Sequence, residues 1–183
     1  KLDRNRENVI VVNSLSKNMG MSGWRVGYVI GHKTIIKQML KLNQHMITCA
    51  ASILQEYMSE HFFEILENTI PQAIETANKR EAVRKMMDNL GIRALQGAGT
   101  FYFLIDVSDF PGETEELAYD LLLNHNIATV PGEAYGESTK RFLRFGIGVE
   151  GLEDIERSLR KIKEFLDLET YDSSKIRIQM KEY

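Results

Sequence analysis

The chain has 183 residues, 43% of them hydrophobic, which is typical of one large globular domain or of parts of two. Its formal net charge of −3 provides no overall positive field that would favour nucleic acid or an anionic membrane as a partner. The single cysteine, Cys49, excludes an internal disulfide, and we expect it to be a small buried residue in a reducing compartment. No apolar run approaches the roughly 20 residues of a membrane-spanning helix, and no segment has the pattern of a signal peptide. We therefore expect a cytoplasmic protein.

The first half of the chain predicts two short strands followed by long helices. Residues 9–12 and 26–30 are apolar or β-branched runs, which indicate buried strands. Apolar residues then recur at helical spacing over residues 33–48 and 50–66. Pro71 falls inside this periodic region and should kink or restart the helix.

The second half of the chain predicts a mixture of helices and strands. A long helix after the proline should end at Gly91, since glycine is common just past a helix C-terminus. The remaining elements are recognised by β-branched and aromatic content or by amphipathic spacing. Strands are expected at 101–107, 127–130 and 142–145, and helices at 113–124 and 152–165.

This order of elements predicts an α/β chain with two structural units joined by the long helix. The boundary is expected around residues 71–78, which gives a first unit of 1–75 and a second of 76–169. Residues 170–183 form a polar tail with a weak alternation of apolar residues, and the pattern predicts no definite element there.

Residues 14–27, SLSKNMGMSGWRVG, place a lysine in an unusual setting. A lysine after a strand is ordinarily a surface residue, but Lys17 stands beside the small hydroxyls of Ser14 and Ser16 and before a glycine-rich stretch. Arg25 adds a rigid guanidinium fork suited to a phosphate or a carboxylate. An amine beside such anion ligands is what an aldehyde cofactor that carries a phosphate requires.

The same segment resembles the pyridoxal-phosphate (PLP) lysine signature of class I/II aminotransferases, which belong to the PLP-dependent fold type I, the aspartate aminotransferase superfamily. That pattern is a small residue, an apolar residue, a small residue and lysine, a variable stretch, and then G-x-R-[apolar]-G, and every position is filled here. The resemblance implies that Lys17 is the Schiff-base lysine and proton carrier, and that Ser14 and Arg25 bind the phosphate of pyridoxal 5'-phosphate. Ser16 fills a position that the family keeps small and is grouped with the cofactor-binding residues.

Downstream segments extend the resemblance. Residues 141–148, RFLRFGIG, resemble the family strand whose arginine pairs with the substrate α-carboxylate, and the phase of the match selects Arg144. Arg141 is the better candidate for a plain surface arginine on a strand edge. Residues 97–107 resemble the family's G-x-F-Y segment, and 130–136 resemble a loop near the active site, where a lid could close.

Residues 8–166 align in order with the C-terminal half of such an enzyme. The resemblance implies that 1–75 are the C-terminal portion of the large PLP-binding domain and that 76–169 are the small α+β C-terminal domain. The family's residues on the pyridine ring have no counterpart before Lys17, so we expect a fragment. Its activity should be weak or absent, and it should expose apolar surface that the missing half normally covers.

The function implied is an aminotransferase that moves an amino group between an amino acid and a 2-oxo acid and works as a homodimer, without a nucleic-acid or membrane partner. The four histidines lack metal-ligand spacing, so no metal is expected. Alternatives are another fold type I PLP enzyme (a C–S lyase, decarboxylase or synthase), the aminotransferase-like effector domain of a transcription regulator, or a structural fragment that has lost the cofactor. The sequence does not select a particular substrate.

Overall fold

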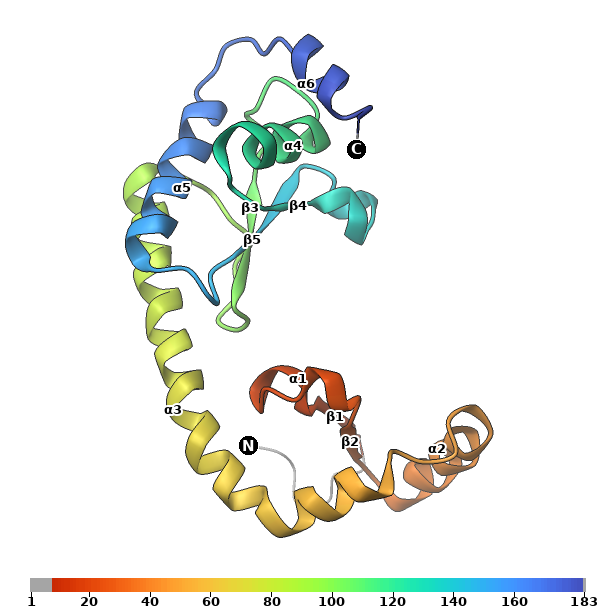
Figure 1. The fold of residues 1–183 in the computed structure, drawn as a ribbon. Coiled ribbons are helices and arrows are strands. Elements are labelled where there is room, and N and C mark those ends of the chain that lie inside the picture. Colours follow the sequence, from red (N-terminus) through yellow and green to blue (C-terminus); the bar gives the residue numbers. More distant parts are fainter. Residues whose placement is uncertain (1–7, 183) are drawn as a thin grey trace. The chain divides into compact units, whose positions relative to one another are not determined.

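The computed structural model describes residues 8–182, and the chain divides into two compact units, one up to Ile74 and one from Glu75 onward. Figure 1 shows the order of helices and strands along the chain. No helix in the described part of the chain is long and apolar enough to cross a membrane.

The first unit is built on an antiparallel two-stranded ribbon. Its strands pair from Val11 opposite Ile30 to Ser14 opposite Gly27. Two short helical turns connect the strands, and two longer helices follow. The elements are β1 (Val11–Ser14), α1 (Leu15–Asn18), the 3₁₀ turn η1 (Ser22–Trp24), β2 (Gly27–Ile30), α2 (Lys33–Met46) and the start of α3 (Ser52–Leu90).

A small core holds the turn between the ribbon strands against α3. Leu15, Met19 and Met21 from the connecting segment are buried with Met58 of α3. Partly buried apolar side chains surround them, among them Trp24. The core therefore fixes the backbone of the segment that carries Lys17, because that lysine lies between two buried anchors.

Much of the remaining apolar surface of this unit is open. Val12 is 74% exposed and Met46 is 77% exposed, and Ile30 is also exposed. The prediction that both strands are buried is therefore wrong: an apolar run shows that a strand suits burial, but every residue of β1 and β2 is exposed or only partly buried. Cys49 is likewise exposed rather than buried.

Helix α3 continues through Pro71, so it does not restart there; the other predicted outcome, a kink, stays a prediction. Proline removes one backbone donor from the helix. Side-chain donors nearby bond to carbonyls one turn earlier: Thr69 Oγ1 donates to the Ile65 carbonyl at 2.8 Å, and Asn68 Nδ2 donates to the Glu64 carbonyl at 2.9 Å. Both contacts lie in the turns just before Pro71.

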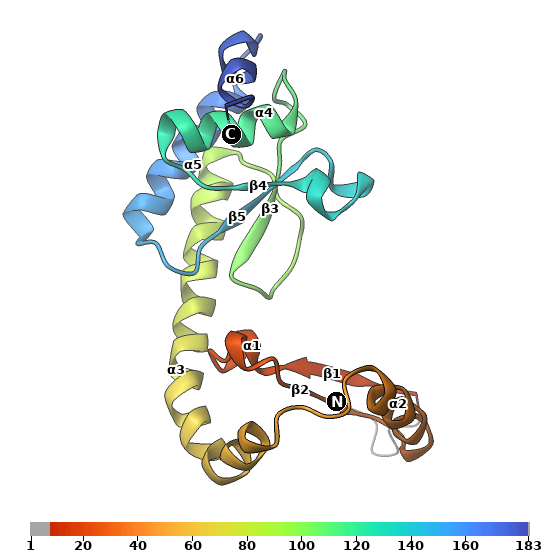
Figure 2. The same ribbon diagram turned by 45° about the vertical axis from the view of Figure 1, so that its right-hand side comes forward.

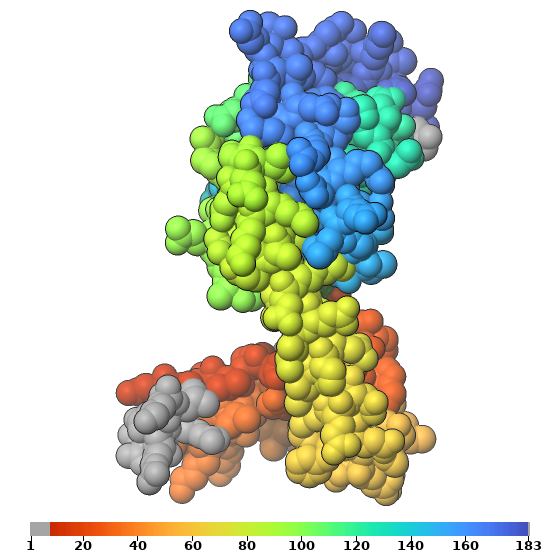
Figure 3. Space-filling view, turned by 90° about the vertical axis from the view of Figure 1, so that its left-hand side faces the viewer, coloured from red at the N-terminus to blue at the C-terminus, as the bar shows by residue number. Residues whose placement is uncertain are grey.

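The second unit contains a three-stranded antiparallel sheet with strand order β3-β5-β4. The C-terminal part of α3 and α5 lie side by side, as Figures 2 and 3 show. The elements are β3 (Tyr102–Asp106), α4 (Thr114–His125), β4 (Val130–Pro131), the 3₁₀ turns η2 (Gly132–Tyr135) and η3 (Glu137–Thr139), β5 (Phe142–Gly146), α5 (Leu152–Leu166) and α6 (Ser174–Gln179).

The large core of this unit joins one face of the sheet to the helices. Alternation along β3 and β5 turns Phe103, Ile105, Leu143 and Phe145 inward, and each is at most 4% exposed. Val83 and Met87 of α3, Leu117 and Leu121 of α4, and Ile155, Leu159 and Ile162 of α5 belong to the same cluster. The other face of the sheet, with Tyr102 and Arg144, stays partly open.

The polar tail contains a short helix that packs on the second unit. Ile176 of α6 is 2% exposed, whereas Ile178 is 63% exposed, so the alternation in the sequence marks one buried position on a helix. Arg177 pairs with the buried carboxylate of Glu116 on α4. Tyr171 Oη donates to Asp120 at 2.7 Å. The tail therefore contributes side chains to the core of the unit.

Candidate functional site

The turn after β1 brings two serine hydroxyls together, and Lys17 is the next residue. Ser14 ends β1 and caps α1, and its Oγ accepts a hydrogen bond from the Ser16 backbone N–H at 3.2 Å. The same Oγ lies 2.9 Å from Ser16 Oγ. Lys17 is the next residue on this turn, and its side chain is exposed. Three of the residues identified in the sequence thus lie within one helical turn.

Strand pairing brings Arg25 to the same end of the ribbon. Ser14 pairs with Gly27, and the Leu15 N–H donates to the Val26 carbonyl at 3.1 Å, so the ladder continues one step beyond the strands. Arg25 has a left-handed backbone conformation with φ of 54° at the end of η1. Its Nη1 donates to the Ser22 carbonyl at 2.7 Å. Its guanidinium forms no ion pair with the described residues.

Glycine is needed where the two strands approach most closely. A Cβ at Gly27 would lie 2.7 Å from the Asn13 carbonyl oxygen, closer than real Cβ atoms come to such an atom. The glycine of the G-x-R-[apolar]-G pattern therefore has a backbone role here. It lets the chain return from Arg25 alongside the end of β1. Ser14, Lys17 and Arg25 are exposed residues at this end of the ribbon. Hydroxyl, amine and guanidinium groups are the kinds of donor that suit a phosphate-bearing aldehyde.

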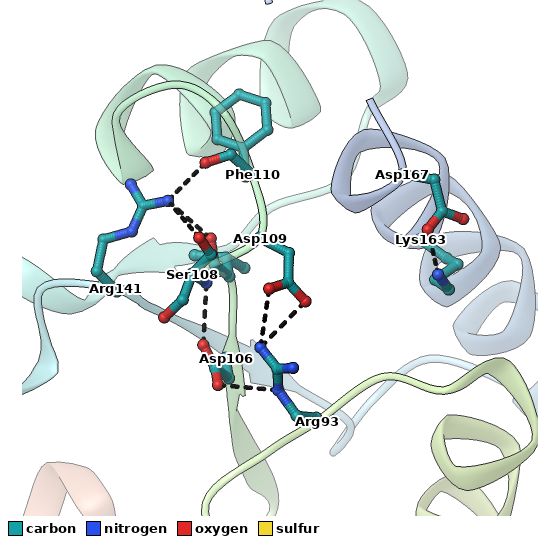
Figure 4. A network of polar contacts seen from close by, with 9 residues as sticks. Arg93, Asp106, Ser108, Asp109, Phe110, Arg141, Lys163 and Asp167 are labelled. Atoms are coloured by element: carbon teal, nitrogen blue, oxygen red, sulfur yellow. Dashed lines mark hydrogen bonds and ion pairs between the residues drawn. The ribbon is translucent and has the colours of Figure 1, made fainter. Parts of the chain in front are cut away.

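Arg141 has a structural role in the second unit (Figure 4). Its guanidinium donates to four backbone carbonyls, those of Phe110 at 2.6 Å, Gly112 at 2.7 Å, Val107 at 3.0 Å and Ser108 at 3.3 Å. It therefore closes the loop between β3 and α4. The interpretation of Arg141 as a plain surface arginine is wrong, because sequence phase shows on which face of a strand a residue lies but not which loop lies against it.

Arg144 has a different environment, on the open face of the sheet. Its guanidinium carbon lies 4.5 Å from the centre of the Tyr102 ring. Its Nη1 donates to Tyr135 Oη at 3.0 Å. Among the described residues no carboxylate lies within 4.0 Å of it. A guanidinium with only neutral partners and partial exposure can accept an external anion.

Most of the other arginines in the described chain have a carboxylate or backbone carbonyls as partners. Five of them each pair with at least one carboxylate at 3.2 Å or less: Arg84, Arg93, Arg157, Arg160 and Arg177. Arg80, like Arg141, donates to backbone carbonyls. Arg144 differs from the five paired arginines in having no carboxylate partner among the described residues, as does Arg25, and it differs from Arg80 and Arg141 in donating to a side-chain hydroxyl, Tyr135 Oη.

Sequence reasoning missed the two tyrosines. Both belong to segments that the sequence analysis noted, 97–107 and 130–136, but neither was assigned a role. Strand register explains the contact with Tyr102: Arg144 pairs with Leu104, and Tyr102 pairs with Gly146, so Tyr102 and Arg144 are diagonal neighbours on one face. The pairing of β3 with β5 sets this register, and the sequence alone does not specify it.

Comparison with known proteins gives a consistent result. Residues 2–162 match the family model of aminotransferase class I and II. The chain is 32% identical over 168 residues to a (5-formylfuran-3-yl)methyl phosphate transaminase of Methanocaldococcus jannaschii, a match that covers 91% of this chain and 44% of the relative. It is 34% identical over 154 residues to a probable aspartate/prephenate aminotransferase of Thermus aquaticus, which covers 80% of this chain and 39% of that protein. The chain thus spans less than half the length of these relatives.

Solved structures show the same fold. A Methanococcus jannaschii crystal structure, described as similar in its active site to kynurenine aminotransferases, matches with a TM-score of 0.72 and 32% identity over 89% of this chain and 43% of its own. The aromatic aminotransferase of Pyrococcus horikoshii has a TM-score of 0.74 at 24% identity, covering 90% of this chain and 44% of its own. The predicted α/β class is confirmed. The chain belongs to the class I and II aminotransferase family.

Proposed function

We propose that this chain is part of a PLP-dependent aminotransferase, in which its first unit is the C-terminal portion of the large cofactor-binding domain and its second unit the small domain. The observation that carries the proposal is the turn at the end of β1, where Lys17 follows two mutually hydrogen-bonded serines and strand pairing returns Arg25 to the same end. The relatives named as transaminases support the reaction type.

The residues of the turn have separate roles in this proposal. Bound pyridoxal 5'-phosphate would supply an electron sink for bond breaking at an amino acid's Cα. Lys17 provides the amine that anchors the cofactor aldehyde, and its Nζ then carries a proton to and from the substrate. Arg25 and the hydroxyls of Ser14 and Ser16 hold the phosphate, since a guanidinium and hydroxyls donate hydrogen bonds to its oxygens.

Arg144 binds the substrate carboxylate in this proposal. A bidentate guanidinium fixes the orientation of an amino acid or a 2-oxo acid, which is the requirement for proton transfer at Cα. Support comes from the absence of a carboxylate partner for Arg144 among the described residues. The complete enzyme is proposed to act as a cytoplasmic homodimer on an amino acid and a 2-oxo acid.

The test is to add pyridoxal 5'-phosphate to the chain, record the visible spectrum, reduce with borohydride and locate the modified lysine by mass spectrometry. We expect a saturable visible band and a label concentrated on Lys17. Lys17→Ala should abolish both, whereas Lys33→Ala, which removes an exposed lysine of the same unit, should leave them unchanged. A label scattered over many lysines, equally in the Lys17→Ala variant, would contradict the assignment of the cofactor to this turn.

A further inference from the structure

We propose that Tyr102 and Tyr135 are positioning residues that hold the Arg144 guanidinium in one orientation before a carboxylate arrives. The inference rests on the proposed function, because it takes Arg144 as the carboxylate-binding residue. It adds two residues to which the sequence analysis assigned no role. Tyr102 contacts one face of the guanidinium, and Tyr135 contacts one of its nitrogens.

The contact with Tyr135 leaves two parallel N–H donors of Arg144 able to bind a carboxylate. The guanidinium has five N–H groups, and Nη1 donates to Tyr135 Oη at 3.0 Å. No other acceptor is recorded for Arg144 among the described residues. Nε and Nη2 form a pair of parallel donors that does not include Nη1, and such a pair matches the two oxygens of a carboxylate. Tyr135 can therefore stay in place while a carboxylate binds.

Tyr102 is itself held firmly. Its carbonyl oxygen accepts hydrogen bonds from Arg80 Nη1 at 2.7 Å and from Thr100 Oγ1 at 2.9 Å. Arg80 is only 9% exposed, stacks on the Phe103 ring at 3.9 Å and also donates to the Gly97 carbonyl at 2.8 Å. A buried cation thus fixes the start of β3. The residue opposite Tyr102 is a glycine, so no cross-strand side chain occupies the space beside its ring.

The turn that carries Tyr135 is also fixed. Thr139 Oγ1 donates to the Gly132 carbonyl at 2.8 Å and lies 2.9 Å from the Gly136 carbonyl, which ties η2 to the segment leading into β5. Gly132 is packed so tightly that a Cβ would lie 1.8 Å from the Thr139 carbonyl oxygen. Tyr135 is 51% exposed, but the backbone on both sides of it, at Gly132 and Gly136, accepts hydrogen bonds from Thr139. The backbone of each tyrosine is therefore fixed by contacts that do not involve Arg144, which limits where each side chain can reach.

The experiment uses the 183-residue chain with isotope-labelled arginine side chains, studied by NMR, with pyruvate as a simple carboxylate probe. Two quantities are measured: the rate of rotation of the Arg144 guanidinium in the free chain, and the dissociation constant for pyruvate. Tyr135→Phe removes only the hydroxyl, and Tyr102→Leu removes the aromatic face. Tyr102→Phe keeps that face, and Tyr119→Phe is a matched control on α4, for which no hydroxyl contact is recorded in the described chain.

We expect Tyr135→Phe and Tyr102→Leu to speed the rotation and to weaken pyruvate binding about threefold to tenfold. Tyr102→Phe and Tyr119→Phe should stay within about twofold of the unaltered chain, because neither changes a recorded contact of Arg144. All four variants should keep the denaturation midpoint of the unaltered chain, so that a loss of fold cannot explain the result.

The outcome separates this inference from the proposed function. Arg144→Lys keeps the charge but removes the fork, so it should lose pyruvate binding if Arg144 is the carboxylate site. Suppose that Arg144→Lys loses pyruvate binding, while Tyr135→Phe and Tyr102→Leu change neither the rotation of the Arg144 guanidinium nor pyruvate binding. That result would overturn the positioning role of the tyrosines but support Arg144 as the carboxylate site. Unchanged binding in Arg144→Lys, or no saturable binding to the unaltered chain, would instead overturn Arg144 as the carboxylate site.

Discussion

Arg141 and Arg144 stand three residues apart in a segment that reads RFLR, yet their surroundings give them opposite roles. Arg141 donates to four backbone carbonyls of the loop between β3 and α4. Arg144 contacts two tyrosines and no described carboxylate. The first is therefore a structural residue, and the second is available for an external ligand.

This difference predicts that the two arginines contribute unequally to stability. Arg141→Ala removes the guanidinium that donates to four carbonyls, and we expect the free energy of unfolding to fall by about 2–4 kcal/mol. Arg144→Ala removes a ring contact and one hydrogen bond on a half-exposed surface, so the loss should be below about 1 kcal/mol. Urea denaturation of both variants measures the two values. A larger loss for Arg144→Ala than for Arg141→Ala would contradict the assignment of roles.

Asp106 links the stability of the second unit to pH. Burial tends to raise the pKa of this carboxyl, but hydrogen bonds from Ser108 and the guanidinium of Arg93 outweigh burial and hold the pKa below its usual range (Figure 4). A carboxyl whose pKa is lower in the folded state stabilises the fold above its unfolded-state pKa of about 3.9. That stabilisation is lost as the pH falls through the lower folded-state pKa.

We therefore expect Asp106→Asn to be less stable than the unaltered chain near neutral pH, and the difference to shrink as the pH falls below about 4. Urea denaturation at a series of pH values measures this difference. Glu137→Gln is the control, because Glu137 is an exposed carboxylate with no ion pair recorded in the described chain. A constant difference between Asp106→Asn and the unaltered chain at all pH values would show that the carboxyl does not titrate as argued.

At the scale of elements, α6 allows a direct test of what the tail contributes. Ile176 is 2% exposed and Ile178 is 63% exposed on the same helix. Ile176→Ala should lower the free energy of unfolding by about 2–4 kcal/mol, because it removes buried methyl groups and leaves a cavity. Ile178→Ala should change it by less than about 0.5 kcal/mol. Equal small effects in urea denaturation would mean that the tail is not part of the folded unit.

The elements show where prediction from sequence succeeds and where it stops. The helices predicted at 113–124 and 152–165 are observed as Thr114–His125 and Leu152–Leu166, because helical periodicity and its end signals are local. The strand predicted at 127–130 is observed only at Val130–Pro131, since pairing with β5 determines its extent.

The same limit applies to the candidate site. The residues of the lysine turn are adjacent in the sequence, so a motif is enough to find them. The contact of Arg144 with Tyr102 depends on sheet register, and the contact with Tyr135 depends on how the turn of Gly132 packs against Thr139. Both arise from tertiary structure, which a pattern along the chain does not contain.

At the scale of the whole molecule, the two units have very unequal cores. The second unit buries a continuous cluster that joins α3, α4, α5 and the sheet, whereas the cluster of the first unit consists of Leu15, Met19, Met21 and Met58. The ribbon and α2 leave apolar side chains open, among them Val12, Leu42 and Met46. A hollow of about 400 Å³ lined by apolar residues of β2 and α2 lies on this surface. Because buried apolar area is the main source of stability, the units should differ in stability.

Hydrogen exchange followed by mass spectrometry tests this difference. Amides of β3, β5, α4 and α5 should exchange slowly, because their opening requires the large core to unfold, and amides of β1, β2 and α2 should exchange much faster. Within α3 the protection should rise from the Ser52 end toward Val83 and Met87, which belong to the large core. Measurement at two protein concentrations separates intrinsic protection from association, since self-association through the open apolar face would slow exchange in α2 only at the higher concentration. Equal protection of both units at the lower concentration would show that the small core is sufficient, and that the exposed apolar surface of the first unit does not reduce its stability.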